Sequence, residues 1–293
     1  MTKGFCNSII LYNKEVSDGS FRMGISWKAQ AVRPGQFVML KASRGHDPLL
    51  RRPFGIYNVI GAKPGSALKG RGIEVLYRVV GRGTEILSTR KPGESVDVLG
   101  PLGNGFPSIS GKSKIIIVAG GMGIAPLNLL AKTLNPPYPP LDKGGIGGVF
   151  LFGARDKAQS ALAKGLKGIK CKVKLSTEDG SAGKKGLVTG LLMEEVSTDS
   201  VIYACGPAGM LKAVAKIALE AEVECHVSLE RAMACGMGAC LGCAVKSAGG
   251  HLIPPLLKGG LRGVEENKTY KMVCSDGPVF NSLDIDWDRF DER

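Results

Sequence analysis

The first hundred residues alternate short apolar segments with turns that contain glycine or proline. The apolar segments lie at residues 36–41, 55–60, 73–80 and 95–99, and the pairs Pro34-Gly35 and Pro92-Gly93 come shortly before two of them. Short strands separated by such turns at regular intervals are typical of a small antiparallel barrel. We therefore predict an all-β domain over residues 1–105.

A different pattern follows the glycine-rich stretch at residues 100–106. Continuous apolar runs, typical of buried strands, lie at residues 114–119, 149–152, 171–176, 201–204 and 223–228. A helix is predicted to follow residues 205–210 and to run to about residue 221. Strands that alternate with helices form parallel sheets, whose ligands bind at the carboxyl ends of the strands. The sequence therefore predicts an α/β domain over residues 106–224 and leaves residues 225–293 as a third, smaller domain.

Two of the predicted buried strands run directly into glycine-rich turns. Residues 120–126 (GGMGIAP) follow the first strand of the α/β pattern, and residues 205–210 (CGPAGM) follow the run at 201–204. A strand, a glycine turn and a helix form the start of a dinucleotide-binding unit, in which the turn lies against the pyrophosphate. Because residues 120–126 match G-x-G-x-x-G imperfectly, this turn alone predicts only a nucleotide-binding role.

Another glycine-rich turn lies inside the predicted barrel. Residues 77–84 (YRVVGRGT) precede a short helix that is predicted to begin near residue 85. The first N–H groups of a helix bind anions, so a pyrophosphate can rest there. The guanidinium of Arg52, within RRPFGIY at residues 51–57, or that of Arg82 can pair with phosphate oxygens. An ordinary β-turn is the alternative for this motif.

The chain is organised around CGMGACLGC at residues 235–243, which Cys274 completes. The spacing C-x4-C-x2-C…C is the plant-type pattern for a [2Fe–2S] cluster, which four thiolates hold. Glycines allow such a loop to curl closely around the cluster and to point N–H groups at its sulfurs. Zinc sites favour separate C-x2-C pairs, so a zinc site and a set of structural cysteines are weaker alternatives. We expect the apolar groups from Met233 to Met237, together with Leu241, to limit the access of water to this loop.

Composition narrows the classes of function. The chain has 39 Lys and Arg against 26 Asp and Glu, which gives a net charge of +13. These basic residues are scattered, without the basic patch interleaved with aromatic residues that binds nucleic acid, so we expect no nucleic-acid partner. No apolar run approaches the roughly 20 residues of a membrane span, and no signal-peptide pattern precedes the first strand. We therefore expect a cytoplasmic protein without a membrane partner and with reduced thiols.

Several chemically versatile residues are predicted to have structural roles only. These are Cys6, Cys171, His46, His226 and His251. A repeated segment is also set apart: residues 139–148 and 254–263 share seven of ten positions around PPLxKGG. Segments rich in proline and glycine lack the apolar pattern of a packed element, so we interpret both copies as inserted surface loops.

Taken in order, these motifs resemble a known family. RPF at 52–54, GRGT at 81–84, GGMGIAP at 120–126, CGP at 205–207 and the cysteine loop are similar to the ferredoxin–NADP reductase superfamily. They most closely resemble the electron-transfer subunits of NAD-dependent (type B) dihydroorotate dehydrogenases, over nearly the whole chain outside the two repeats. The resemblance implies an FAD-binding antiparallel β-barrel (1–105), a parallel-sheet NAD(P)-binding domain (106–224) and a small C-terminal [2Fe–2S] domain (225–293).

The resemblance also implies which residues hold each cofactor. FAD is expected at Arg52, Pro53, Phe54, Gly55, Ile56, Tyr77, Gly81, Gly83 and Thr84. NAD(H) is expected at Gly120, Gly121, Gly123, Ile124, Ala125, Pro126, Gly206 and Pro207, with Cys205 as the catalytic residue near the point of hydride transfer. The cluster is expected at Cys235, Cys240, Cys243 and Cys274.

The chain departs from the superfamily pattern at two places. The flavin motif R-x-Y-S/T ends here in Phe54-Gly55, so two hydroxyl groups are absent, although the ring of Phe54 can still stack on a flavin. Cys274 also follows Cys243 at a longer distance than is usual in the family, and the second repeat accounts for the extra length.

The resulting hypothesis is electron transfer between NAD(H) and a partner subunit. A flavin exchanges both hydride and single electrons, so it can link a nicotinamide to an iron–sulfur cluster. The resemblance implies an FMN-containing catalytic subunit that oxidises dihydroorotate in pyrimidine (UMP) synthesis, within a heterotetramer of two copies of each subunit. The alternatives are a subunit of another complex, such as a ferredoxin:NADP⁺ oxidoreductase or a sulfide dehydrogenase, and a non-catalytic redox sensor.

The sequence leaves the choice between NAD and NADP open. No acidic residue is clearly placed to bind a ribose hydroxyl, and Arg155 is compatible with either dinucleotide.

Overall fold

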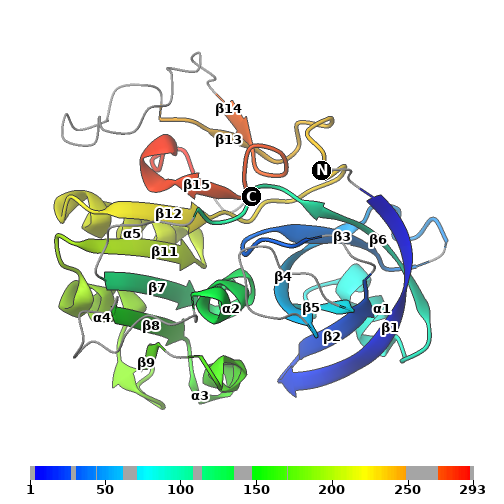
Figure 1. Ribbon diagram of the computed structural model, residues 1–293, viewed down its shortest axis with the longest axis horizontal. Helices are drawn as coiled ribbons and strands as arrows, with labels where there is room; N and C mark the ends of the chain where they lie inside the picture. Colours follow the sequence, from blue (N-terminus) through cyan, green and yellow to red (C-terminus); the bar gives the residue numbers. More distant parts are fainter. Residues whose placement is uncertain are drawn as a thin grey trace.

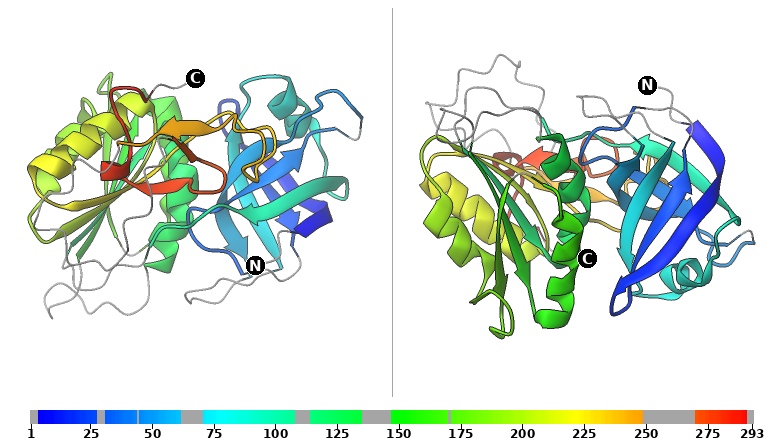
Figure 2. Two further views of the ribbon diagram at one scale, coloured as in Figure 1. Left: turned by 90° about the horizontal axis from the view of Figure 1, so that it is seen from above. Right: turned by 60° about the horizontal axis from the view of Figure 1, so that its bottom comes forward.

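The computed structural model describes residues 4–27, 31–43, 45–61, 71–107, 114–134, 147–169, 171–248 and 270–290. A barrel and an α/β half lie side by side, and the C-terminal strands run along one edge of both (Figures 1 and 2). Of the two repeats, residues 139–146 and 254–263 lie outside the described residues. The interpretation of the repeats as surface loops therefore stays a prediction.

In the N-terminal half, six strands close into an antiparallel barrel in the order β1-β2-β5-β4-β3-β6. They are β1 (Gly4–Ser17), β2 (Ser20–Ser26), β3 (Phe37–Lys41), β4 (Arg52–Ile60), β5 (Gly72–Arg78) and β6 (Ser95–Leu102), with helix α1 (Arg82–Thr89) between the last two. On β1, Ile10 is fully buried whereas Ile9 and Leu11 are 42% and 43% exposed, as expected of a strand with one face toward a core. The predicted barrel is confirmed, and β1 and β2 extend it beyond the four predicted segments.

In the second half, seven strands form one sheet in the order β10-β9-β8-β7-β11-β12-β15. They are β7 (Lys114–Gly120), β8 (Gly147–Ala154), β9 (Lys172–Thr177), β10 (Lys184–Lys185), β11 (Ser200–Cys205), β12 (Glu224–Ser228) and β15 (Val279–Asn281). All but β15 pair in parallel. Chain order reverses between β7 and β11, and ligands of open α/β sheets bind at the carboxyl ends of the strands at such a point.

Helices cover both faces of this sheet. Helices α4 (Val188–Glu195) and α5 (Ala208–Glu220) pack into the core on one face, and α2 (Ile124–Thr133) packs into the core on the other. Helix α2 lies between the sheet and the barrel (Figure 2). There the buried side chain of Asn128 donates a hydrogen bond from Nδ2 to the carbonyl oxygen of Tyr57 at 3.0 Å. The two halves are therefore joined by a packed and hydrogen-bonded contact.

The C-terminal segment shares its packing with both halves. Strands β13 (Ala244–Lys246) and β14 (Tyr270–Met272) form an antiparallel hairpin, and β15 then returns to pair with β12. One continuous core contains Cys243 from this segment, Met39 from the barrel and Val227 from the sheet. The predicted third domain thus contributes a strand to the sheet, and the boundaries at 105/106 and 224/225 stay predictions.

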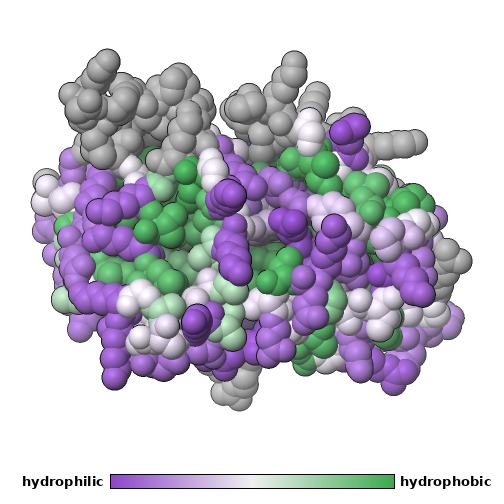
Figure 3. Space-filling model, turned by 90° about the horizontal axis from the view of Figure 1, so that it is seen from below, coloured by the Kyte–Doolittle hydropathy of each residue, from purple (hydrophilic) through white to green (hydrophobic). Residues whose placement is uncertain are grey.

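The surface of the molecule is mixed. On the face shown in Figure 3, apolar residues form separate patches on both halves, with polar residues between them. Among the helices in the described part of the chain, none has the length and apolar character needed to cross a membrane.

Candidate cofactor and electron-transfer site

The cysteine loop gathers four sulfur atoms around a short stretch of backbone. The N–H groups of Met237 and Cys240 point at the sulfur of Cys235 at 3.5 and 3.4 Å, and that of Gly238 points at the sulfur of Cys274 at 3.1 Å. The sulfurs of Cys243 and Cys274 lie 3.2 Å apart. Donors aimed at sulfur are the environment that iron–sulfur clusters use to hold thiolates.

The backbone of the loop explains its glycines. Gly236 and Gly238 have φ of 72° and 87°, in the left-handed region that favours glycine, and Leu241 also has a positive φ of 56°. A Cβ on Gly236 would lie 2.9 Å from Cγ of Met39, so the loop packs directly on strand β3 of the barrel. The predicted requirement for glycine is therefore met at Gly236 and Gly238, whereas Leu241 takes the tight turn expected near Gly242.

The electrostatics of the loop favour thiolate at one cysteine and oppose it at another. Burial disfavours ionisation of Cys235, but the N–H groups of Met237, Cys240 and Ala239 lower its pKa to about 6. Burial and the adjacent Cys243 raise the pKa of Cys274 to about 12. Cationic iron favours the thiolate form of its ligands, so it would offset the repulsion within the close pair.

The four cysteines supply the number of thiolates that a [2Fe–2S] cluster takes. The sulfurs of Cys243 and Cys274 lie close together, and the side chain of Cys240 interacts with the sulfur of Cys235. A [2Fe–2S] cluster takes four thiolates for two irons, so two pairs are the arrangement it needs.

The outer edge of the loop is open to solvent. Cys243 and Cys274 are buried, Cys235 is half-buried and Cys240 is exposed. Met237 and Leu241 are 45% and 64% exposed, so the expectation that they shield the loop from water is wrong for these two residues. The loop thus has an inner side toward the barrel and an outer side that another molecule can approach.

Two motifs far apart in the sequence meet on the barrel. The guanidinium of Arg52 lies against the first turn of α1. A Cβ atom added to Gly83 in that turn would be only 2.8 Å from Nε of Arg52. The hydroxyl of Thr84 accepts hydrogen bonds from the N–H groups of Val80 and Gly81 at 2.9 and 3.2 Å and so fixes this turn. A phosphate at the N-terminus of α1 would meet both the helix N–H groups and a cation, which fits the pyrophosphate of FAD.

Other predicted flavin residues face inward. Phe54 and Ile56 are 8% and 0% exposed, and the ring of Phe54 packs edge-on against Tyr77 with centroids 5.5 Å apart. Burial raises the pKa of Tyr77 to about 12, and its hydroxyl donates to Asn13 at 3.0 Å. These three side chains belong to the barrel core, so the expected stacking of Phe54 on flavin does not agree with the structure. The alternation of a strand leaves Gly55 on the outer face, against Pro126 of α2.

The glycine turns after β7 and β11 meet at the switch point of the sheet. A Cβ on Gly120 would lie 2.6 Å from the sulfur of Met210, and one on Gly206 would lie 3.0 Å from the backbone nitrogen of Gly120. A Cβ on Gly123 would collide with the carbonyl oxygen of Cys205. The two turns therefore approach each other more closely than any other residue type permits, as in dinucleotide-binding units.

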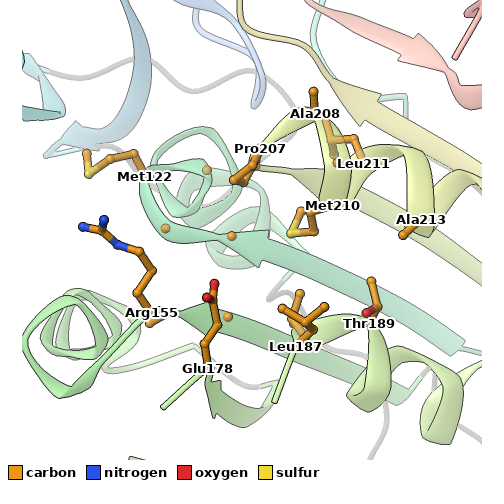
Figure 4. A pocket seen from close by; sticks show the side chains of 18 of the residues that line it. Met122, Arg155, Glu178, Leu187, Thr189, Pro207, Ala208, Met210, Leu211 and Ala213 are labelled. Carbon is orange, nitrogen blue, oxygen red and sulfur yellow. The ribbon is translucent and has the colours of Figure 1, made fainter. Parts of the chain in front are cut away.

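Both turns open into a cleft of about 760 Å³. Gly120, Gly121, Gly123, Gly206 and Pro207 line it, together with Arg78 and Val80 from the barrel. Arg155 and Glu178 extend into it from one side, and Pro207 and Met210 lie on the other (Figure 4). A dinucleotide that crosses the carboxyl ends of the strands fits this arrangement.

Four predicted dinucleotide-side residues are not in the lining of this cleft. Ile124 and Ala125 are 0% and 6% exposed in the core beneath it, and Pro126 is buried against Gly55. Cys205 is fully buried; burial and the nearby carboxylate of Glu230 raise the pKa of its thiol well above the usual range. The thiol of Cys205 is therefore held neutral beneath the cleft, and its expected place near the point of hydride transfer stays a prediction.

The structure adds cleft residues that the sequence analysis missed. Glu178 and Glu230 each follow a predicted strand within two residues, and acidic residues at strand ends were the available signal. Phe290 lines the same cleft from the C-terminal segment, and no local pattern in the sequence indicates that position.

Comparisons with known proteins agree with this geometry. Residues 230–252 match the iron-sulfur cluster binding domain of dihydroorotate dehydrogenase B, and residues 117–216 match the oxidoreductase NAD-binding domain. Among solved structures, an NADH-dependent reduced ferredoxin–NADP oxidoreductase shares 28% identity with a TM-score of 0.73, over 98% of this chain and 92% of that chain. Phthalate dioxygenase reductase has the same fold, with 16% identity and a TM-score of 0.61 over 92% and 94% of the two chains.

Curated relatives align over most of both chains. The protein named dihydroorotate dehydrogenase B (NAD(+)), electron transfer subunit, of Caldanaerobacter subterraneus subsp. tengcongensis is 37% identical over 92% of this chain and 94% of its own. The protein of the same name from Desulforamulus reducens is 40% identical over 89% of each chain. The chain therefore belongs to the family of electron transfer subunits of dihydroorotate dehydrogenase B (NAD(+)).

Proposed function

We propose that this chain passes electrons between NAD(H) and a catalytic partner subunit, through bound FAD and a [2Fe–2S] cluster. In this proposal the partner oxidises dihydroorotate during pyrimidine synthesis. The position of the cysteine loop is the observation that carries it. The loop packs on Met39 and Leu102, both buried in the flavin-binding barrel, so a cluster held there is fixed beside the barrel.

The chain's own residues bind, orient and enclose the cofactors. When bound, flavin exchanges hydride with nicotinamide and single electrons with an iron–sulfur cluster. Arg52 and the first turn of α1 would hold the pyrophosphate of FAD, and the turn at Gly120 would hold that of NAD(H). The N–H groups that point at the sulfurs of Cys235 and Cys274 would stabilise thiolate charge at the cluster.

We propose that the partner docks over the outer edge of the cysteine loop. The exposed side chains of Met237 and Leu241 flank the exposed Cys240 there. Exposed apolar side chains around a redox centre favour a contact with another protein, and such a contact excludes water from the path of the electron. An FMN-containing catalytic subunit, in an assembly with two copies of each subunit, is the partner that we propose.

We further propose a preference for NAD(H) over NADP(H). The carboxylate of Glu178 extends into the cleft just after the end of β9 (Figure 4). A carboxylate there can accept a hydrogen bond from a ribose hydroxyl and would repel a 2′-phosphate. This preference is measured as the kcat/KM of the wild-type protein with NADH divided by its kcat/KM with NADPH.

The test of the proposal begins with anaerobic protein that carries both cofactors. Addition of NADH is expected to bleach the flavin bands and to produce the EPR signal of a reduced [2Fe–2S] cluster. Reconstitution with the dihydroorotate-oxidising subunit is then expected to give dihydroorotate-dependent reduction of NAD⁺ only when this chain is present. Reduction of NAD⁺ at the same rate without the chain would refute the proposal.

A second candidate is the corresponding subunit of a ferredoxin-linked complex. The 28% identity with the ferredoxin–NADP oxidoreductase structure over 98% of this chain favours it as the alternative. Cluster reduction by NADH without any activity toward dihydroorotate in the presence of the partner would support this candidate instead.

A further inference from the structure

The C-terminal residues 282–290 form a hook that runs from strand β15 to the dinucleotide cleft. The chain leaves β15 through a short 3-10 helix (Ser282–Asp284), and its last described residue, Phe290, lines the cleft together with Met210 and Glu230. The hook has no part in the function proposed so far.

One end of the hook is tied to the hairpin that carries the cluster. The N–H of Ala248 donates to the carbonyl oxygen of Asp284, and the N–H of Asp286 donates to that of Lys246, both at 3.0 Å. The ammonium of Lys271 in β14 also pairs with the carboxylate of Asp284 at 2.9 Å. These bonds fix the hook to β13 and β14, whose strands begin and end beside Cys243 and Cys274.

The other end of the hook is held by packing at the cleft. The guanidinium of Arg231 lies over the ring of Phe290 at 4.8 Å from its centroid, and Trp287 packs edge-on to that ring at 5.4 Å. The indole N–H of Trp287 donates to the carbonyl oxygen of Ser282 at 2.8 Å. The ion pair of Lys212 with Asp288 is exposed and contributes little, so aromatic packing sets the position of the Phe290 ring.

The position of Phe290 identifies the part of the dinucleotide that it would meet. The glycine turn after β7 lies at the switch point, where the pyrophosphate binds, and Glu178 lies toward β9 on one side. If Glu178 holds the adenosine ribose, the nicotinamide half extends the other way, toward β11 and β12. Glu230 and Phe290 line the cleft on that side, next to the N-terminus of α5.

We propose that Phe290 is a dinucleotide-binding residue that packs against the nicotinamide half of NAD(H). The inference rests on the proposed function, because it assumes that the cleft binds NAD(H). An aromatic ring offers a flat apolar surface to a nicotinamide and its ribose, and such contacts contribute beyond the area they bury. The cluster-bearing segment would thereby complete the dinucleotide site of the preceding domain.

Fragments of the dinucleotide test the inference on the complete protein with FAD and cluster bound. Isothermal titration gives dissociation constants of NAD⁺ and of ADP, which lacks the nicotinamide half, for the wild type and for Phe290→Ala. Phe290→Ala is expected to weaken NAD⁺ binding by about three- to tenfold and to leave ADP binding unchanged. Tyr270→Ala removes an aromatic side chain that is 56% exposed on β14, outside the cleft, and should change neither constant.

The outcomes separate the inference from the proposed function. An unchanged NAD⁺ constant in Phe290→Ala, or an equal loss for NAD⁺ and ADP, would overturn the role of Phe290. Failure of the wild type to bind NAD⁺ would instead overturn the proposed function. If Phe290→Ala does not fold with its cofactors, Phe290→Leu replaces it, because leucine keeps an apolar side chain. Phe290→Leu should weaken NAD⁺ binding by a smaller factor than that expected for Phe290→Ala, and it should leave ADP binding unchanged.

Discussion

The cysteine loop and strand β4 both carry cofactor motifs, yet they present their residues in different ways. In the loop, backbone N–H groups point at the sulfurs of Cys235 and Cys274, and the sulfur of Cys243 lies next to that of Cys274. On β4, alternate side chains point to opposite faces, so Phe54 and Ile56 enter the barrel core while Gly55 faces α2. A motif on a loop can thus be carried over residue by residue, whereas a motif on a strand contributes only every second side chain.

The largest effect is expected from the loop. Cys243→Ser replaces a buried thiolate ligand and should abolish the EPR signal of the cluster and the electron transfer to the partner. Reduction of a dye by NADH through the flavin should survive, because the barrel and the cleft are unchanged. Cys171→Ser is the matched control, since Cys171 lies outside the loop, and it should retain both activities. A Cys243→Ser protein with a normal cluster signal would show that Cys243 is not a ligand of the cluster.

The next largest effect is expected where the two glycine turns touch. A Cβ on Gly123 would collide with the backbone of Cys205, so Gly123→Ala must separate the turns. We expect NAD⁺ affinity to fall by on the order of 100-fold, with a lower melting temperature, because backbone at this contact cannot move aside cheaply. Gly190→Ala in helix α4 meets nothing within 4 Å and serves as the control in the same titration and melting experiments. Equal NAD⁺ affinities and equal melting temperatures of the two variants would contradict the close approach of the two glycine turns.

A smaller effect is expected at the barrel. Arg52→Ala should weaken FAD binding by about 10- to 100-fold, because it removes a charge-assisted hydrogen bond to phosphate. Arg82→Ala should have less effect, since its side chain is 70% exposed and pairs with Asp47 at 2.6 Å. Flavin fluorescence during equilibrium dialysis measures the FAD dissociation constants of both variants. A larger loss of FAD affinity in Arg82→Ala than in Arg52→Ala would indicate that Arg82 binds the pyrophosphate.

The smallest effect on cofactor binding is expected at Phe54. Phe54→Leu leaves a gap beside Tyr77 and should lower the free energy of unfolding by roughly 1–2 kcal/mol. Because the side chain of Phe54 faces the core, FAD binding to the folded protein should be nearly unchanged. Urea denaturation and FAD titration of the same preparation separate the two quantities. A large loss of FAD affinity without a loss of stability would restore the flavin-stacking role.

The sequence alone determined the features that depend on local spacing or on periodicity. The intervals of apolar segments predicted the barrel and the parallel sheet, because burial of one strand face leaves a pattern in every strand. The spacing of Cys235, Cys240 and Cys243 predicted the cluster loop, since its three ligands and its N–H donors lie within nine residues. Glycine at Gly120 and Gly206 likewise predicted a nucleotide turn, because only glycine permits such close backbone contact.

Which side chains reach each cofactor depends on how the elements pack against one another. Arg52 meets Gly83 because β4 and α1 are brought together by closure of the barrel. Glu178 and Phe290 share one cleft although 112 positions separate them, and the sheet and the hook that join them leave no local pattern. The burial of Cys205 beneath the glycine turns likewise follows from tertiary packing and not from its local motif. Side-chain direction and long-range contact depend on how elements pack, and a linear sequence records those contacts only indirectly.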